Sequence, residues 1–149
     1  MEYEVNFPQP EFVTTEFSHE KHRGIARVNI ALANLDHKFL FTWQLSLLLE
    51  LKTTQDDGQP TSEDQKEISR YEKWLDEQLN PDDDRPNALF LSRVTWNKTV
   101  ELVWRIHNPE EANEILQDII EEKDYPFPFD YQIDPDEDWE LADWHLKKR

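Results

Sequence analysis

The chain has 149 residues, and its 37% hydrophobic and 12% aromatic content is enough for one domain with a packed core, which argues against a disordered chain. Its 33 acidic residues against 16 lysines and arginines give a net charge of −17, which disfavours binding to nucleic acid or to an anionic membrane surface. Cysteine is absent, which excludes disulfides and zinc–thiolate sites. Neither a signal peptide nor a membrane-spanning apolar run is visible, so we expect a cytoplasmic protein.

One domain is expected, with three parts. These are an N-terminal extension (residues 1–36), a core (residues 39–133) and an acidic and aromatic C-terminal segment (residues 134–149). In the first part, residues 12–18 and 25–32 read as the two strands of a hairpin, whose charged loop ends at Gly24. This hairpin could extend the sheet of the core.

The core begins with a long strand and a helix. Hydrophobic and polar residues alternate over residues 39–51, which predicts a strand with one buried face. Ser62 with Gln65 resembles a capping box at the start of a helix. The hydrophobic residues of that helix follow at helical spacing: Ile68, Tyr71, Leu75 and Leu79.

Two further strands are predicted at residues 88–96 and 99–107. Asn97 and Lys98 between them are typical of a two-residue hairpin turn, because Asn tolerates the left-handed conformation. The alternation places Phe90, Val94 and Trp96 on one face of the first strand, and Val100, Leu102, Trp104 and Ile106 on one face of the second.

The core ends with a second helix and a strand. Residues 108–122 read as an amphipathic helix, with Asn108 as its cap and Pro109 at its first position. Residues 125–133 alternate like a strand, and the two prolines inside this pattern place it at an edge of the sheet.

The predicted order of elements in the core is strand, helix, strand, strand, helix, strand. This order is typical of the ferredoxin-like βαββαβ fold. We therefore predict an α+β protein, a ferredoxin-like sandwich in which two helices cover one face of an antiparallel sheet, preceded by the N-terminal β-hairpin. Trp139 and Trp144 follow the core, and Trp139 is explained most simply as packing against it.

The predicted second helix has an acidic side. Its members are Glu111, Glu114, Asp118, Glu121 and Glu122. No basic residue occurs in residues 108–122, and the next one is Lys123. Like charges at this spacing repel, and acids in a last turn face the negative end of the helix dipole. Local rules that are broken without local compensation often mark a functional surface.

The acidic run continues beyond this helix. Its further members are Asp124, Asp134, Asp136, Glu137 and Asp138, followed by Trp139. We expect the helix acids and this run to form one docking surface for a basic protein, with Trp139, Tyr125 or Tyr131 as an aromatic anchor. A surface that only keeps the protein in solution is the alternative interpretation.

Two patterns resemble metal sites without completing them. His19 and His22 have metal-like spacing, but a solvated charged loop explains them better. Asp134, Asp136 and Asp138 match the first three ligand positions of a calcium-binding loop. The pattern then fails, because Trp139 stands where the loop needs Gly and His145 where it needs Glu. We expect no metal site and no cofactor.

One group of polar side chains is expected on a single side of the sheet. Its members are Gln44, Arg93, Thr95, Glu101, Arg105 and His107. A titratable histidine beside an acid and arginines is the minimum for acid–base catalysis. Cross-strand charge pairing on a wet sheet face also explains the group, and we favour that interpretation.

Several short motifs follow one another between residues 39 and 139. They are Asp57-Gly58-Gln59-Pro60, a strand at 89–95, Asn108-Pro109-Glu110, an aromatic strand at 125–131 and Asp138-Trp139. In these motifs the chain resembles an uncharacterised bacterial family of domains of unknown function. Similar domains are sometimes fused to domains resembling ribonuclease E inhibitor B, an acidic protein that binds and restrains an enzyme. The resemblance supports the fold and assigns no catalytic residue.

These features together predict a non-enzymatic protein. We expect an acidic inhibitor of the immunity type, which neutralises a basic toxin or nuclease by occluding its active site. The fusion partners of similar domains imply a first alternative, a regulator of a housekeeping ribonuclease. A second alternative is an enzyme that uses the sheet residues His107, Glu101, Arg105 and Arg93.

Overall fold

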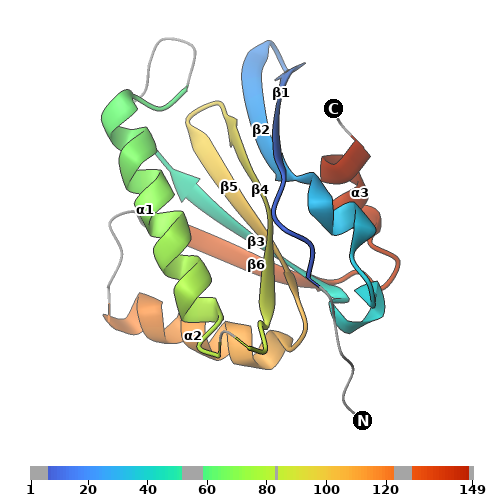
Figure 1. Ribbon diagram of the computed structural model, residues 1–149. Helices are drawn as coiled ribbons and strands as arrows, with labels where there is room; N and C mark the ends of the chain where they lie inside the picture. The colour runs from blue at the N-terminus through green and yellow to red at the C-terminus, as the bar shows by residue number, and fades with distance from the viewer. Residues whose placement is uncertain (1–6, 52–58, 83, 123–128, 148–149) are drawn as a thin grey trace.

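The protein is built on one six-stranded antiparallel sheet with helices on both faces (Figure 1). The computed structural model describes residues 7–51, 59–82, 84–122 and 129–147. In chain order the elements are β1 (Phe12–His19), β2 (His22–Asn29), the 3₁₀ helices η1 (Ile30–Asn34) and η2 (Lys38–Leu40), β3 (Trp43–Glu50), α1 (Ser62–Leu79), β4 (Ala88–Trp96), β5 (Thr99–Ile106), α2 (Pro109–Glu122), β6 (Phe129–Pro135) and α3 (Glu140–Lys147). The strands are arranged in the order β1-β2-β4-β5-β3-β6.

The sheet separates two hydrophobic cores. On one face, α1 and α2 bury Ile68, Leu75 and Leu116 against β3 and β5. On the other face, α3 and η1 bury Leu146 and Leu32 against β2 and β4. The α+β class is therefore confirmed, and α1 and α2 share a face as predicted. The ferredoxin-like topology is not confirmed, because the sheet has six strands in the order above and α3, which the sequence pattern does not predict, covers the second face.

The N-terminal hairpin extends the sheet. β1 pairs with β2, and β2 pairs with β4. Glu20 and Lys21 form the turn with φ of 49° and 69°, so β2 begins earlier than predicted. Asn97 and Lys98 have the same left-handed conformation, with φ of 44° and 69°, which confirms the predicted two-residue turn between β4 and β5.

Gly24 in β2 lies beneath the ring of Phe17, its cross-strand partner in β1. A Cβ atom at Gly24 would lie 2.1 Å from that ring. The Phe17 ring also meets Trp144 edge-on, with 5.8 Å between the ring centroids. We expect Gly24→Ala to push the two rings apart and to lower the free energy of unfolding by about 1–3 kcal/mol. Urea unfolding measures this change, with Ser18→Ala on β1 as the control, and equal stability of the two variants would contradict the close approach.

β3 is shorter than the alternating pattern predicts. It begins at Trp43, because the chain forms η2 at residues 38–40 and leaves it through Phe41 and Thr42 before the strand starts. The carbonyl of Phe41 accepts a hydrogen bond from the side chain of Arg105 at 3.1 Å. The carbonyl of Thr42 accepts one from the backbone N–H of Asp136 at 2.7 Å. The first contact ties Phe41 to a side chain rather than to a neighbouring strand, and the second continues the pairing of β3 with β6 by one residue.

A β-bulge in β4 changes the predicted strand faces. The pairing of β4 with β5 shifts at Leu91, which is an extra residue. Phe90 therefore lies opposite Trp104 on the side of α1, whereas Val94 belongs to the core on the side of α3. The prediction that Phe90 shares a face with Val94 and Trp96 is wrong for that reason. On β5 the predicted face is confirmed, since one core contains Val100, Leu102, Trp104 and Ile106.

The predicted helix starts lie close to the observed ones. α1 begins at Ser62, but its cap is Thr61, whose hydroxyl accepts a hydrogen bond from the N–H of Asp64 at 3.3 Å. α2 begins at Pro109 and is capped by Asn108, as predicted. β6 lies at the sheet edge, also as predicted, and the two prolines before it lie outside the described residues. None of the described helices is long and apolar enough to cross a membrane.

Candidate functional site

The outer side of α2 is an exposed row of carboxylates. Its members are Glu111, Glu114, Asp118, Glu121 and Glu122. The inner side of the helix buries Ala112, Leu116 and Ile119. Within the described part of the chain, no lysine or arginine forms an ion pair with any of the five carboxylates. We call these five residues the acidic face of α2. Asp124, predicted to continue it, lies outside the described residues.

The acids of the C-terminal segment do not join this face. Glu137 and Asp138 are exposed in the turn before α3, and α3 covers the opposite side of the sheet from α2 (Figure 1). Asp134 in β6 is half-buried and accepts hydrogen bonds from Gln132 at 2.9 and 2.8 Å. The prediction of one continuous docking surface is therefore wrong, because the sheet lies between its two halves.

Asp136 and Trp139 are buried, which contradicts their predicted role in docking. The side chains of Asp136 and Arg105 have exposed fractions of 7% and 0%, and Oδ2 of the first lies 2.7 Å from Nη1 of the second. The ring of Trp139 covers the guanidinium of Arg105, 4.3 Å from its centroid. Burial lowers the pKa of Arg105, and its hydrogen bond to Asp136 opposes that effect. Trp139 instead packs in the core on the side of α3, as the simpler interpretation predicts.

The polar group predicted on one side of the sheet is divided between both faces. The bulge turns Arg93 and Thr95 toward α1, whereas Glu101 and Arg105 lie on the side of α3. Glu101 accepts a hydrogen bond from a serine hydroxyl in β3. The Nδ1 atom of His107 donates to a backbone carbonyl 2.6 Å away. The residues of the predicted enzyme alternative therefore do not form one site.

His19 and His22 face each other across the turn of the first hairpin. Both contact the ring of Trp96, with centroid distances of 5.4 and 5.7 Å. Over the described ranges, no group of three or more His, Asp or Glu side chains is placed to hold a metal ion. The two histidines thus pack on an aromatic ring at the end of the hairpin.

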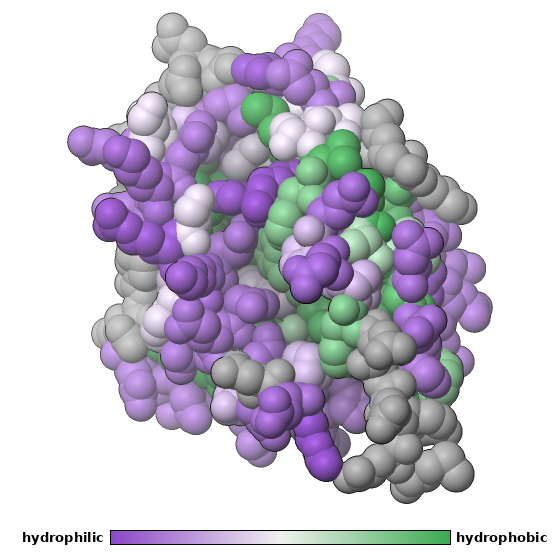
Figure 2. Space-filling view, viewed as in Figure 1, coloured by the Kyte–Doolittle hydropathy of each residue, from purple (hydrophilic) through white to green (hydrophobic). Residues whose placement is uncertain are grey.

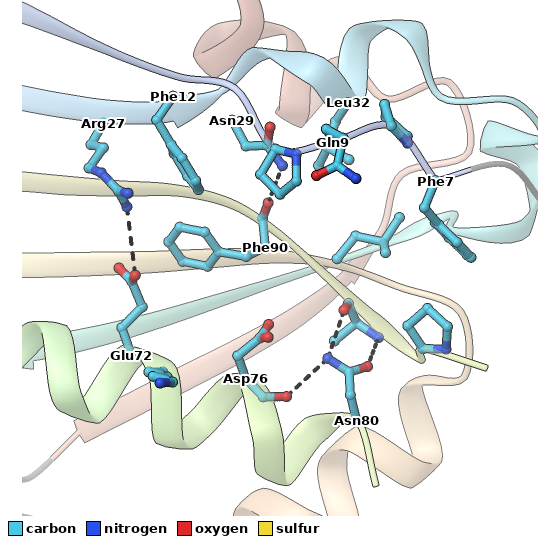
Figure 3. A pocket seen from close by; sticks show the side chains of 16 residues that line it. Phe7, Gln9, Phe12, Arg27, Asn29, Leu32, Glu72, Asp76, Asn80 and Phe90 are labelled. Carbon is cyan, nitrogen blue, oxygen red and sulfur yellow. Dashed lines mark hydrogen bonds and ion pairs between the residues drawn. The ribbon is translucent and has the colours of Figure 1, made fainter. Parts of the chain in front are cut away.

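The structure adds a site that the sequence does not predict, a pocket beside α1. Its volume is about 650 Å³, and it lies between the C-terminal half of α1 and the strands β2 and β4 (Figure 3). Space remains there because β1 and β2 extend the sheet beyond the part that α1 and α2 cover (Figure 1). The rings of Phe12 and Phe90 line it with their centroids 6.2 Å apart, and Phe7 lies at one end. Figure 2 shows hydrophobic surface in the middle of this face, beside the hydrophilic surface of α1.

Two carboxylates one helical turn apart on α1 line this pocket. Burial raises the pKa of both Glu72 and Asp76. For Asp76 the effect is opposed by Trp104, whose Nε1–H donates a hydrogen bond at 3.0 Å. For Glu72 it is opposed by the charges of Arg93 and Arg27. Carboxyl groups with raised pKa values in a concave aromatic pocket are typical of ligand sites.

Two arginines face Glu72 from the sheet. Arg27 in β2 and Arg93 in β4 are direct cross-strand partners. Arg93 Nε lies 3.3 Å from Glu72 Oε1, and Arg27 Nη1 lies 3.8 Å from Glu72 Oε2. The sequence gives only a weak signal of this group, an arginine inside each of two hydrophobic strands. Their meeting depends on a strand register that no local pattern reveals.

Comparison with known proteins gives this chain a family. No curated protein and no solved structure matches the sequence. A family model described as a family of unknown function, DUF695, matches residues 16–144, a range that contains α1, α2 and most of α3. The chain therefore belongs to this family of unknown function, DUF695.

Proposed function

We propose that the protein is a non-catalytic inhibitor that binds a basic macromolecule through the acidic face of α2, as an immunity protein binds the toxin or nuclease that it neutralises. One observation carries this proposal: five exposed carboxylates on one helix have no basic partner in the described part of the chain. The net charge of −17 adds a long-range attraction for a basic partner.

The acidic face does not stabilise α2; the buried inner side of the helix does. Each repulsive pair three or four residues apart costs about 0.2–0.5 kcal/mol, and the acids of the last turn add about 0.3–1 kcal/mol. On the inner side, Leu116 and Ile119 have exposed fractions of 0% and 5%. Burial of a side chain of that size stabilises by about 1.5–3 kcal/mol. Because the inner side outweighs the repulsion, the outer side is free to carry charges that serve binding.

A rigid acidic helix suits the blocking of a basic active site. An enzyme that acts on nucleic acid presents lysines and arginines to the phosphates of its substrate. Glu114 and Asp118, which lie one turn apart, present carboxylates that can take the place of those phosphates. Complementary charge of this kind chiefly raises the association rate and excludes wrong partners.

Charge reversal on α2 tests the proposal. We expect the triple variant Glu114→Lys, Asp118→Lys and Glu121→Lys to associate with the partner about 10–1,000 times more slowly than the wild type. All three residues are exposed, so the variant should fold normally. A control with the same net charge reverses three exposed carboxylates elsewhere: Glu67, Glu77 and Glu137.

The partner is first captured from cell extract on the immobilised wild-type protein, and association rates are then measured over a range of ionic strengths. Equal rates for the α2 variant and its control, or a captured partner without a basic surface, would contradict the proposal. The identity of the captured protein separates a toxin from a housekeeping ribonuclease.

A further inference from the structure

Two arginines of this strongly acidic chain lie directly opposite each other in the sheet. Arg27 and Arg93 are cross-strand partners in β2 and β4, and both reach toward Glu72 on α1. Like charges opposite each other on neighbouring strands destabilise a sheet. The chain has 33 acidic residues against 16 lysines and arginines, so two arginines paired with each other are not expected by chance from its composition. Such an arrangement needs an anion to compensate it.

Glu72 compensates the two arginines only in part. It lies 3.3 Å from Arg93 Nε and 3.8 Å from Arg27 Nη1. Its Oε1 atom is buried and accepts no hydrogen bond of good geometry. Arg93 Nη1 donates to Ser69 Oγ at 3.1 Å, and the other guanidinium N–H groups have no acceptor in the ranges that the structure describes. Two positive charges thus share one negative charge, and several of their N–H groups have no protein acceptor among the described residues.

Both arginines border a cavity of about 210 Å³ next to the N-terminal half of α1. Gln65 and Ser69 line it from the helix, and Ile25 and Thr95 line it from the strands. No acidic side chain is among the described residues that line it. The cavity has room for several water molecules. It can therefore hold a phosphoryl group and the first atoms bonded to it.

We propose that Arg27 and Arg93 bind the phosphoryl group of a small ligand in this cavity. Guanidinium groups donate pairs of parallel hydrogen bonds to phosphate oxygens, and two of them on neighbouring strands can hold a tetrahedral group between them. The net charge of −17 disfavours a nucleic acid as the source of that group, so the ligand is a small phosphorylated molecule. This site is separate from the acidic face of α2 and goes beyond the proposed inhibitor function.

Both guanidinium groups are held in place without a ligand. Arg27 lies over the ring of Phe12, 3.7 Å from its centroid, and points toward Glu72 (Figure 3). Arg93 is fixed by Glu72 and Ser69, and its side chain has an exposed fraction of 16%. Donors that are already ordered lose little entropy on binding. Glu72, in turn, competes with the ligand for the same two arginines.

Titration of isotope-labelled protein with inorganic phosphate, at an ionic strength held constant with chloride, tests the site by NMR. We expect saturable shifts of the Nε–H signals of Arg27 and Arg93. Arg27→Gln should weaken phosphate binding by about tenfold or more. Glu72→Gln keeps the size of the side chain and removes the competing charge, so it should tighten binding severalfold. Arg85→Gln in an exposed loop removes the same charge elsewhere and should bind like the wild type.

Opposite effects of the two variants cannot both arise from a loss of folding, because unfolding would weaken binding in each. The proposal is overturned if Arg27→Gln binds phosphate as tightly as Arg85→Gln. It is also overturned if Glu72→Gln binds no more tightly than the wild type. Acetate is titrated in parallel, and acetate binding as tight as that of phosphate would overturn the assignment of a phosphoryl group.

Discussion

Replacing Asp136 with Ala is expected to lower the free energy of unfolding by about 3–5 kcal/mol, because the change leaves Arg105 buried without its anion. The side chain of Arg105 has an exposed fraction of 0%, and its Nη1 lies 2.7 Å from Asp136 Oδ2. Burial lowers the pKa of Arg105, but a guanidinium keeps its proton in proteins. The variant would therefore hold an unpaired charge in its core.

Asp136 also fixes α3 to the sheet. Its carboxylate accepts a hydrogen bond from the backbone N–H of Leu141, in the first turn of α3, at 3.0 Å. Its backbone carbonyl accepts one from Arg105 Nη2 at 2.9 Å. Trp139 lies over the same guanidinium, 4.3 Å from the ring centroid. Loss of the carboxylate should loosen α3 and expose Trp139, which a red shift of the tryptophan fluorescence would report.

Urea unfolding followed by circular dichroism measures the loss of stability. Asp138→Ala removes an exposed carboxylate two residues later and should change the free energy of unfolding by less than about 0.5 kcal/mol. Adding Arg105→Met to Asp136→Ala should restore part of the stability, because the unpaired charge is then removed as well. If Asp136→Ala loses no more stability than Asp138→Ala, the ion pair does not hold α3 in place.

Asp136 shows why part of the candidate surface could not be predicted from the sequence. It stands in a run of acidic residues and therefore reads as surface charge, but its partner Arg105 lies 31 residues earlier on β5. Predictions succeeded where the physical cause is local. The turn at Asn97 and Lys98, the cap at Asn108 and the spacing of the two long helices each depend on residues a few positions apart.

The bulge at Leu91 illustrates the predictions that failed. One extra residue in β4 reverses the direction of every side chain that follows it, so the polar group expected on one face was divided. The arginines of the phosphate site meet through the register of β2 with β4, which no neighbouring residue determines. α3 has only 8 residues, too few for a helical period to stand out in the sequence.

The free energy of unfolding is also expected to depend on His145 as the pH falls from 6.5 to 4. Burial lowers the pKa of this residue from 6.5 to about 4. In the unfolded chain the imidazole takes up a proton near its ordinary pKa, whereas in the folded protein it takes one up only as the pH approaches 4. Protonation therefore favours the unfolded chain as the pH decreases. Since one pKa unit corresponds to about 1.4 kcal/mol, the stability lost through His145 is about 3 kcal/mol.

His145→Asn isolates this contribution. Nδ1 of His145 lies 2.7 Å from Ser92 Oγ, and an asparagine oxygen can accept the same hydrogen bond without titrating. Glu72 and Asp76 have raised pKa values, so their protonation favours the folded state and acts in the opposite direction. The wild type and His145→Asn both contain Glu72 and Asp76. The effect of these carboxyl groups therefore cancels when the free energies of unfolding of the two proteins are subtracted. Urea unfolding at a series of pH values should show the wild type losing about 3 kcal/mol relative to the variant between pH 7 and pH 4. Parallel curves would mean that the folded protein accepts a proton on His145 as readily as the unfolded chain does.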